Sequence, residues 1–292
     1  MQANIYGILI AASIGIGVIL CVREEKERKL PKDTAIDMAL YAVPSAVIGA
    51  RLYYVAFAWD SFKNNLVSIL YVWEGGLAIY GAVIGGLLGL VFLSKKKKIS
   101  LPILTDMVVP SLILGQTIGR WGNFFNKEAH GGIVKQPFLR FFPVSVQIDG
   151  NWYYATFFYE SVWNFIGFLF LYNNRKNMRE YKGALTLWYF AWYSLGRMVI
   201  EMLRTDSLML GSLRISQVLS LLLFMVSILI LTRKFHTNKI YFLLATGSII
   251  SIVAMAYENI ALLLIAAIIL FAVGEIVYKG FKGKENGQTM AI

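Results

Sequence analysis

The feature that most constrains this chain is a series of apolar runs that recurs along its whole length. Each run has about 17 to 25 predominantly apolar residues, enough for a helix to cross a hydrocarbon core of about 30 Å. We predict nine spans, at residues 4–22, 37–57, 75–93, 101–118, 156–172, 184–200, 214–231, 240–256 and 260–278. Because backbone polar groups in lipid must be satisfied internally, these runs predict an all-α, polytopic membrane protein.

Composition supports the membrane class and gives no sign of a separate soluble domain. Hydrophobic residues make up 58% of the 292 residues, charged residues only 15%, and the mean hydropathy is +0.61. The net charge of +11 does not predict nucleic-acid binding, because the basic residues form short clusters between apolar runs. The single cysteine, Cys21, excludes an intrachain disulfide, and its place in the first run predicts a buried hydrophobe.

The basic clusters between the spans indicate how the chain crosses the membrane. The loops rich in lysine and arginine alternate along the chain, at residues 23–32, 95–98, 175–182, 233–239 and 279–284. Placing these loops in the cytoplasm puts 19 of the 28 lysines and arginines inside, as the positive-inside rule requires. The N-terminus is then expected outside and the C-terminus inside.

Three arginines lie within or at the ends of the predicted spans. A charge near the bilayer centre costs about 2.5 to 3.5 kcal/mol on insertion scales, so such a residue is a functional candidate. Arg51 is expected in the middle of the second span, and Arg120 and Arg197 at the outer ends of theirs.

A run of polar residues continues one helix face beyond the sixth span: Tyr193, Arg197, Glu201 and Arg204. Their spacing of four, four and three places the side chains on one side of a helix and its continuation. The alternative to a functional site is that Arg197 and Glu201 only neutralise each other. Arg204 is expected to be exposed beyond the helix end, three residues after Glu201.

The segment from Gly119 to Gly132 is the most informative stretch. Its glycines let the backbone approach a ligand closely, and Arg120 and Asn123 are i, i+3 neighbours that can address one anionic group. The segment predicts an anion-binding helix end, with a structural turn as the alternative. In the third span, glycines at 81, 85 and 89 form a stripe that predicts close helix packing.

These residues together resemble the prolipoprotein diacylglyceryl transferase family. The segment Gly119–Gly131 is similar to the family signature at Arg120, Gly122, Asn123, Phe124, Asn126, Glu128 and Gly131. Further similarity lies at Tyr6-Gly7, Gly49-Ala50-Arg51, Gly75-Gly76-Leu77 to Gly81, Tyr159-Glu160-Ser161, Tyr193 to Arg204 with Thr205-Asp206, and Ser216-Gln217. The resemblance covers roughly residues 5 to 231.

The resemblance implies a helical body with an outward-facing cavity in the bacterial cytoplasmic membrane. It implies transfer of a diacylglyceryl group from phosphatidylglycerol to the lipobox cysteine of a prolipoprotein signal peptide, with neither cofactor nor metal. The implied catalytic residues are Arg120, Arg197, Tyr80 and Glu201. The implied substrate-binding residues are Arg120, Asn123, Asn126, Glu128, Gly131, Tyr6, Tyr193 and Arg204. The expected domains are a seven-helix transferase core at 1–236 and, at 237–292, two additional transmembrane helices with a short basic tail.

The chain departs from the family pattern at two motifs. Tyr80 stands where many members have a histidine, and Tyr154-Ala155 replaces a His-Pro pair, so the base for the thiol proton stays open. His130 is a second candidate for that base. Three other functions remain as alternatives: an anion transporter, a different phospholipid-headgroup transferase, and an inactive paralogue that acts as a scaffold.

The orientation of the chain gives a first prediction. We expect reporter fusions and cysteine labelling to place residues 95–98 on the cytoplasmic side, because the basic asymmetry there is strong. An external position for these four lysines would contradict the predicted topology.

Overall fold

The computed structural model describes residues 5–205, 207–211, 213–233 and 238–285 of the chain. Its contacts divide the chain into a small unit, Gly15–Ser111, and a large unit, Met1–Ile14 with Leu112–Ile292. Each unit is described by itself. The division between the units falls within two helices, α1 (Ile5–Glu27) and α5 (Leu101–Phe125).

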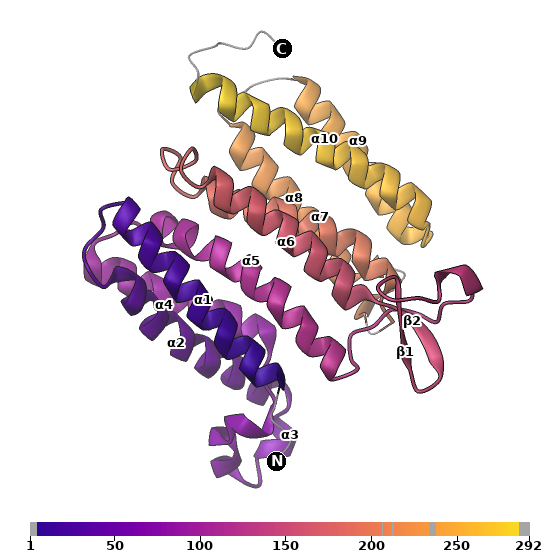
Figure 1. Cartoon of the computed structure of the whole chain (residues 1–292), viewed down its shortest axis with the longest axis horizontal. Coiled ribbons are helices and arrows are strands. Elements are labelled where there is room, and N and C mark those ends of the chain that lie inside the picture. The colour runs from indigo at the N-terminus through magenta and orange to yellow at the C-terminus, as the bar shows by residue number, and fades with distance from the viewer. Residues whose placement is uncertain (1–4, 206, 212, 234–237, 286–292) are drawn as a thin grey trace. The chain divides into compact units, whose positions relative to one another are not determined.

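The described chain is built almost entirely of helices (Figure 1). Besides α1 and α5, the long helices are α2 (Thr34–Phe57), α4 (Ile79–Lys97), α6 (Thr156–Asn174), α7 (Ala184–Ile200), α8 (Ile215–Thr232), α9 (Asn238–Ala256) and α10 (Ile260–Glu285). Short helical turns are α3 (Trp59–Phe62), η1 (Leu66–Leu70), η2 (Val72–Glu74), η3 (Pro137–Leu139) and η4 (Glu201–Leu203). The all-α prediction is confirmed.

Among the described residues, six helices are long and apolar enough to cross a membrane. They are α1, α2, α4, α5, α8 and the part of α10 at Ile260–Gly280, and a shorter apolar helix lies at Ile240–Ala256. A multi-pass membrane protein is therefore confirmed. A long helix lies at each of the nine predicted places, but the number that cross the membrane stays a prediction.

Glycines bring α2 and α4 into contact in the small unit, as the stripe in the sequence predicts. A Cβ at Gly49 would lie 2.9 Å from the Cα of Gly85, so neither position has room for a side chain. At Gly85 and Gly89, a Cβ would meet the backbone carbonyls of Ser45 and Tyr41 on α2. The two backbones thus pack directly against each other, the arrangement that small residues permit in membranes.

Arg51 holds a loop of the small unit and does not lie mid-span as predicted. It lies in the last two turns of α2, and its buried guanidinium donates hydrogen bonds to four backbone carbonyls. The acceptors are Ser68 (2.7 Å), Ile69 (2.8 Å), Gly75 (2.7 Å) and Gly76 (3.2 Å). Gly75 and Gly76 have positive φ values of 89° and 67°, which a helix does not allow, so they belong to this loop. The third span is predicted to begin at residue 75, but its helix begins at Ile79.

In the large unit, helices α6, α7 and α8 run side by side (Figure 1). Trp163 on α6 and Trp192 on α7 stack at 4.7 Å, and each indole N–H donates to the backbone carbonyl of the other residue at 3.0 Å. Tyr278 on α10 donates to Asn174 on α6 at 2.6 Å. These partly buried polar contacts hold the helices against one another. In a bilayer such contacts matter because the hydrophobic effect does not drive helices together.

Two small hairpins interrupt the helices of the large unit. Strand β1 (Ser145–Ile148) pairs antiparallel with β2 (Asn151–Tyr154), joined by Asp149 and Gly150, both with positive φ. This Asp-Gly pair is the preferred chemistry of a two-residue hairpin turn. Strands β3 (Met209–Leu210) and β4 (Leu213–Arg214) form the second hairpin, between η4 and α8.

The glycine packing of α2 on α4 predicts a position-specific loss of stability. Gly85→Ala should lower the free energy of unfolding by about 1–3 kcal/mol, because its Cβ overpacks the backbone of α2. Gly86→Ala is the matched control, since its Cβ would meet Ala46 at an ordinary 3.6 Å. Thermal unfolding in detergent compares the two variants, and equal midpoints would contradict the packing argument.

Candidate functional site

The carboxylate of Glu160 is the centre of a charged cluster in the large unit. Glu160 lies in the second turn of α6 and is 3% exposed. Its Oε1 lies 2.8 Å from Arg197 Nη1 and 3.6 Å from Arg204 Nη1, and its Oε2 pairs with Arg120 Nη2. One carboxylate therefore gathers guanidiniums from α5, from α7 and from the segment that follows η4.

A second carboxylate fixes the other side of Arg197. Glu201 Oε2 lies 2.6 Å from Arg197 Nη2, and Glu201 Oε1 accepts a hydrogen bond from the hydroxyl of Ser207 at 2.7 Å. The predicted i, i+4 pair thus forms, but Arg197 bridges two acids and does not only neutralise one. Three guanidiniums and two carboxylates leave these five groups with one positive charge in excess.

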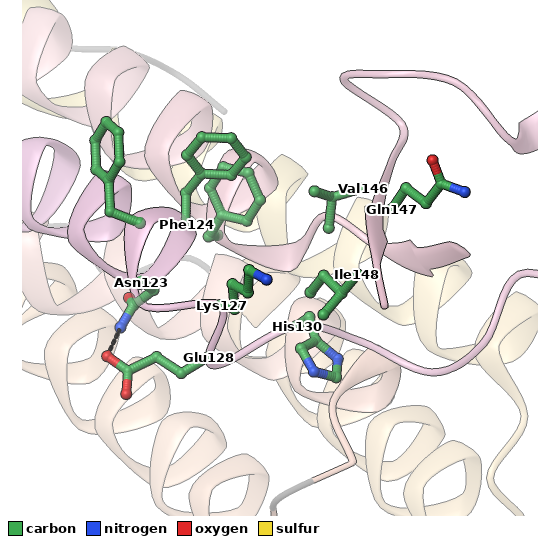
Figure 2. Close-up of a pocket in the computed structure, with 10 residues that line it drawn as sticks. Asn123, Phe124, Lys127, Glu128, His130, Val146, Gln147 and Ile148 are labelled. Atoms are coloured by element: carbon green, nitrogen blue, oxygen red, sulfur yellow. Dashed lines mark hydrogen bonds between the residues drawn. The ribbon is translucent and has the colours of Figure 1, made fainter. Parts of the chain in front are cut away.

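The polar residues of the signature segment lie next to this cluster. Helix α5 continues to Phe125, so Arg120 and Asn123 share a helix face as proposed, and Arg120 Nη1 donates to Asn123 Oδ1 at 3.4 Å. The amide groups of Asn123 and Asn126 donate to Glu128 Oε1 at 3.0 and 3.2 Å. Figure 2 shows Asn123 and Glu128, two residues that line a pocket, joined in this way.

This pocket holds about 250 Å³ between the end of α5 and the β1 strand. Its lining is formed by Asn123, Phe124, Phe125, Lys127, Glu128, His130, Val146, Gln147, Ile148 and Phe157. Apolar rings and aliphatic side chains thus face a small group of polar ones (Figure 2). A pocket with this lining suits an amphipathic ligand.

Gly131 ties the signature segment to the turn after α7. Its N–H donates to the carbonyl of Tyr154 at 2.8 Å, and the N–H of Gly132 donates to the carbonyl of Leu203 at 3.0 Å. A Cβ at Gly131 would lie 2.7 Å from the Leu203 carbonyl oxygen, so no other residue fits there. At the other end of the segment, the ring of Tyr6 packs against Gly122.

Comparison with known proteins identifies the family. The family model of prolipoprotein diacylglyceryl transferase matches residues 1–233. The chain belongs to the prolipoprotein diacylglyceryl transferase family. Among similar relatives, one from Listeria monocytogenes serotype 4a (strain HCC23) is 46% identical over 245 residues, which cover 82% of this chain and 88% of the relative.

Two further relatives come from other bacteria. One from Bacillus cytotoxicus is 47% identical over 241 residues, covering 80% of this chain and 88% of the relative. One from Halalkalibacterium halodurans is 45% identical over 233 residues, covering 77% and 80%. All three relatives are named phosphatidylglycerol–prolipoprotein diacylglyceryl transferase. In this diacylglyceryl transferase chain, α9 and α10 lie beyond the matched residues.

The aromatic candidates of this family member lie in different surroundings. Tyr193 stacks on Tyr189 within α7, with ring centroids 5.9 Å apart. Tyr80 belongs to the small unit, where its half-exposed ring lies 6.3 Å from that of Tyr53. His130 Nδ1 lies 3.0 Å from the Gly131 carbonyl oxygen. Since a carbonyl only accepts, Nδ1 is the donor of this hydrogen bond.

Two expectations about the diacylglyceryl transferase site need correction. Arg204 is not exposed: its side chain is only 10% accessible, and its ion pair is with Glu160, because η4 turns the chain back toward α6. Glu160 was missing from the predicted site residues. Its signal in the sequence is a carboxylate near the start of an apolar span, and such a charge is a functional candidate. Asp206, part of the similar segment, lies outside the described residues.

The central position of Glu160 predicts that its charge stabilises the fold. Glu160→Gln should lower the free energy of unfolding by about 3 kcal/mol, because the partly buried side chains of Arg120 and Arg197 lose their shared, buried counter-charge. Asp149→Asn is the control, since Asp149 is exposed and its pair with Lys127 spans 3.4 Å. Thermal unfolding in detergent measures both. A Glu160→Gln midpoint no lower than that of Asp149→Asn would refute the central role.

Proposed function

We propose that this chain transfers a diacylglyceryl group from phosphatidylglycerol to the cysteine thiol of a prolipoprotein and releases glycerol phosphate. The observation that carries the proposal is the cluster of Arg120, Arg197 and Arg204 around Glu160 and Glu201, five groups that together have one positive charge in excess. Such a cluster suits the phosphate of an anionic lipid better than a neutral ligand. The names of the relatives, which state both substrates, give independent support.

In the proposed reaction the cysteine sulfur attacks the carbon of the diacylglyceryl group that is bonded to a phosphate oxygen. A carbon–sulfur bond forms, the carbon–oxygen bond to phosphate breaks, and glycerol phosphate leaves with the electron pair. Negative charge therefore grows on the leaving group in the transition state. Donors already aimed at that charge stabilise the transition state more than the ground state, and this difference accelerates the step.

The ion pairs of Arg120 and Arg197 support their assignment as the phosphate-stabilising catalytic residues. Each guanidinium is held by a carboxylate, and the two side chains are still about one fifth accessible, at 21% and 18%. Arginine suits this role because its planar group can donate to two phosphate oxygens at once. Glu201, which fixes Arg197, is assigned to the same catalytic group through its 2.6 Å ion pair.

We assign the remaining site residues to substrate binding. Asn123, Asn126 and Glu128 form one hydrogen-bonded group beside Arg120, and Arg204 adds a third guanidinium. Tyr6, Gly131 and Tyr193 are proposed to complete the site by shaping its walls. The mixed polar and apolar lining of the pocket matches a lipid headgroup or the lipobox of a signal peptide, which is apolar around its cysteine.

On the sulfur side we assign Tyr80 as the group that contacts the thiol. A thiolate is the reactive form, and a free thiol has a pKa of about 8.5, so the site must accept or share a proton. Tyr80 is the second residue of α4 and half of its surface is accessible, which suits contact with an incoming peptide. We place the site at the outer face of the bacterial cytoplasmic membrane, where the predicted topology puts the ends of α5 and α7.

A mass measurement tests the proposed function together with its two arginines. Purified protein, phosphatidylglycerol and a synthetic lipobox peptide should yield a peptide heavier by one diacylglyceryl group, with release of glycerol phosphate. Arg120→Lys and Arg197→Lys should each lower the turnover at saturating lipid by about 100- to 1,000-fold, by analogy with single transition-state donors. Lipid binding should fall less.

The control is Arg140→Lys, because Arg140 donates only to loop carbonyls, of Val134 and Lys135, in the described contacts. Its turnover should stay within about twofold of wild type. Absence of a modified peptide with well-folded wild-type protein would refute the function. Near-normal turnover of Arg120→Lys or Arg197→Lys would remove the phosphate role from that residue alone.

A further inference from the structure

Arg214 binds the backbone that carries the charged cluster, without belonging to the cluster. It ends strand β4, immediately before α8, and its side chain is 15% exposed. Its Nη1 donates to the backbone carbonyl of Glu201 and, at 2.9 Å, to that of Arg204. One guanidinium nitrogen thus bridges the two ends of the turn that follows α7.

A cation is favoured at this turn for a simple reason. The Glu201 carbonyl accepts the N–H of Arg204 at 3.1 Å and has room for a second donor, and the negative end of the helix dipole favours a positive charge there. The side chains of the two bridged residues belong to the charged cluster: Glu201 pairs with Arg197, and Arg204 pairs with Glu160. A rotation of this turn would therefore move both Glu201 and Arg204 and would release one side of Arg197.

We propose that Arg214 is a positioning residue for diacylglyceryl transfer. It fixes the turn of Glu201 and Arg204, and through Glu201 it sets the orientation of the Arg197 guanidinium toward the phosphate. The inference rests on the proposed function, and it adds a residue that does not contact the substrate. The described partners of Arg214 are all protein groups: Nη1 donates to two backbone carbonyls, and Nη2 lies near Glu258.

A third contact of Arg214 supplies a matched control. Its Nη2 lies 3.7 Å from Glu258 Oε1, in the turn between α9 and α10, but Glu258 is 61% exposed. An exposed pair at this distance contributes little to stability. Glu258→Gln thus removes the charged partner from Arg214 and leaves both carbonyl contacts of the guanidinium in place.

The test is the kinetics of Arg214→Met, Arg214→Lys and Glu258→Gln in full-length protein, with phosphatidylglycerol in detergent micelles and a lipobox peptide. Arg214→Met should lower kcat on the order of tenfold, equivalent to about 1.4 kcal/mol in the barrier. The KM for phosphatidylglycerol should change less than about twofold, because a transition-state contact is lost and not ground-state binding. Arg214→Lys should recover part of kcat, since its ammonium can still donate to the carbonyls.

Glu258→Gln should keep kcat within about twofold of wild type. Rates are normalised to folded protein by thermal unfolding, so that a loss of folded molecules is not read as a loss of kcat. Three outcomes would overturn the inference: a normal kcat for Arg214→Met, no recovery with lysine, or a loss confined to KM. An inactive wild type would instead refute the proposed function, whereas an active wild type with a normal Arg214→Met refutes the positioning role alone.

Discussion

The site depends on one buried carboxylate that holds several guanidiniums together. Without Glu160, the cationic groups of Arg120 and Arg197 would repel one another in a poorly hydrated place. This repulsion would destabilise the fold more than the same repulsion at the surface. With it, the charges are fixed in position before any lipid arrives. Because these five groups include one carboxylate fewer than arginines, the proposed site is suited to an anion. In this proposal, stability of the fold and readiness for phosphate come from the same ion pairs.

The loops around this cluster supply rigidity that the helices alone do not give. The N–H groups of Gly131 and Gly132 donate to Tyr154 and Leu203, which joins the signature segment to the turn after α7. Arg214 binds the same turn from its other side. These contacts lie in polar connecting segments, as is usual for functional residues carried by a rigid helical scaffold. Preorganised donors of this kind stabilise developing charge without reorganising during the reaction.

The small unit uses the same residue type for a different purpose. The guanidinium of Arg51 is occupied by the carbonyls of the loop at Ser68–Gly76, so its charge stabilises backbone and leaves few donors for a ligand. The cost of placing a charge in the membrane makes Arg51 and Arg120 equally good functional candidates. Their partners in the structure differ. An arginine within a membrane helix is therefore a functional candidate only when its partners leave it both accessible and oriented, as the carboxylates do for Arg120 and Arg197.

The sequence by itself determined the helical membrane class, the position of the long helices, the glycine packing of α4 and the family, and it supplied most of the residues of the proposed site. These features depend on local quantities, namely the length of apolar runs, the 3.6-residue period and a signature within 13 residues. Only the tertiary structure decided that Glu160 meets Arg197 across 37 residues, that the side chain of Arg204 is only 10% accessible, and that Arg214 binds the turn after α7. The physical reason is that helical spacing predicts neighbours on one helix, whereas partners on different helices are chosen by packing.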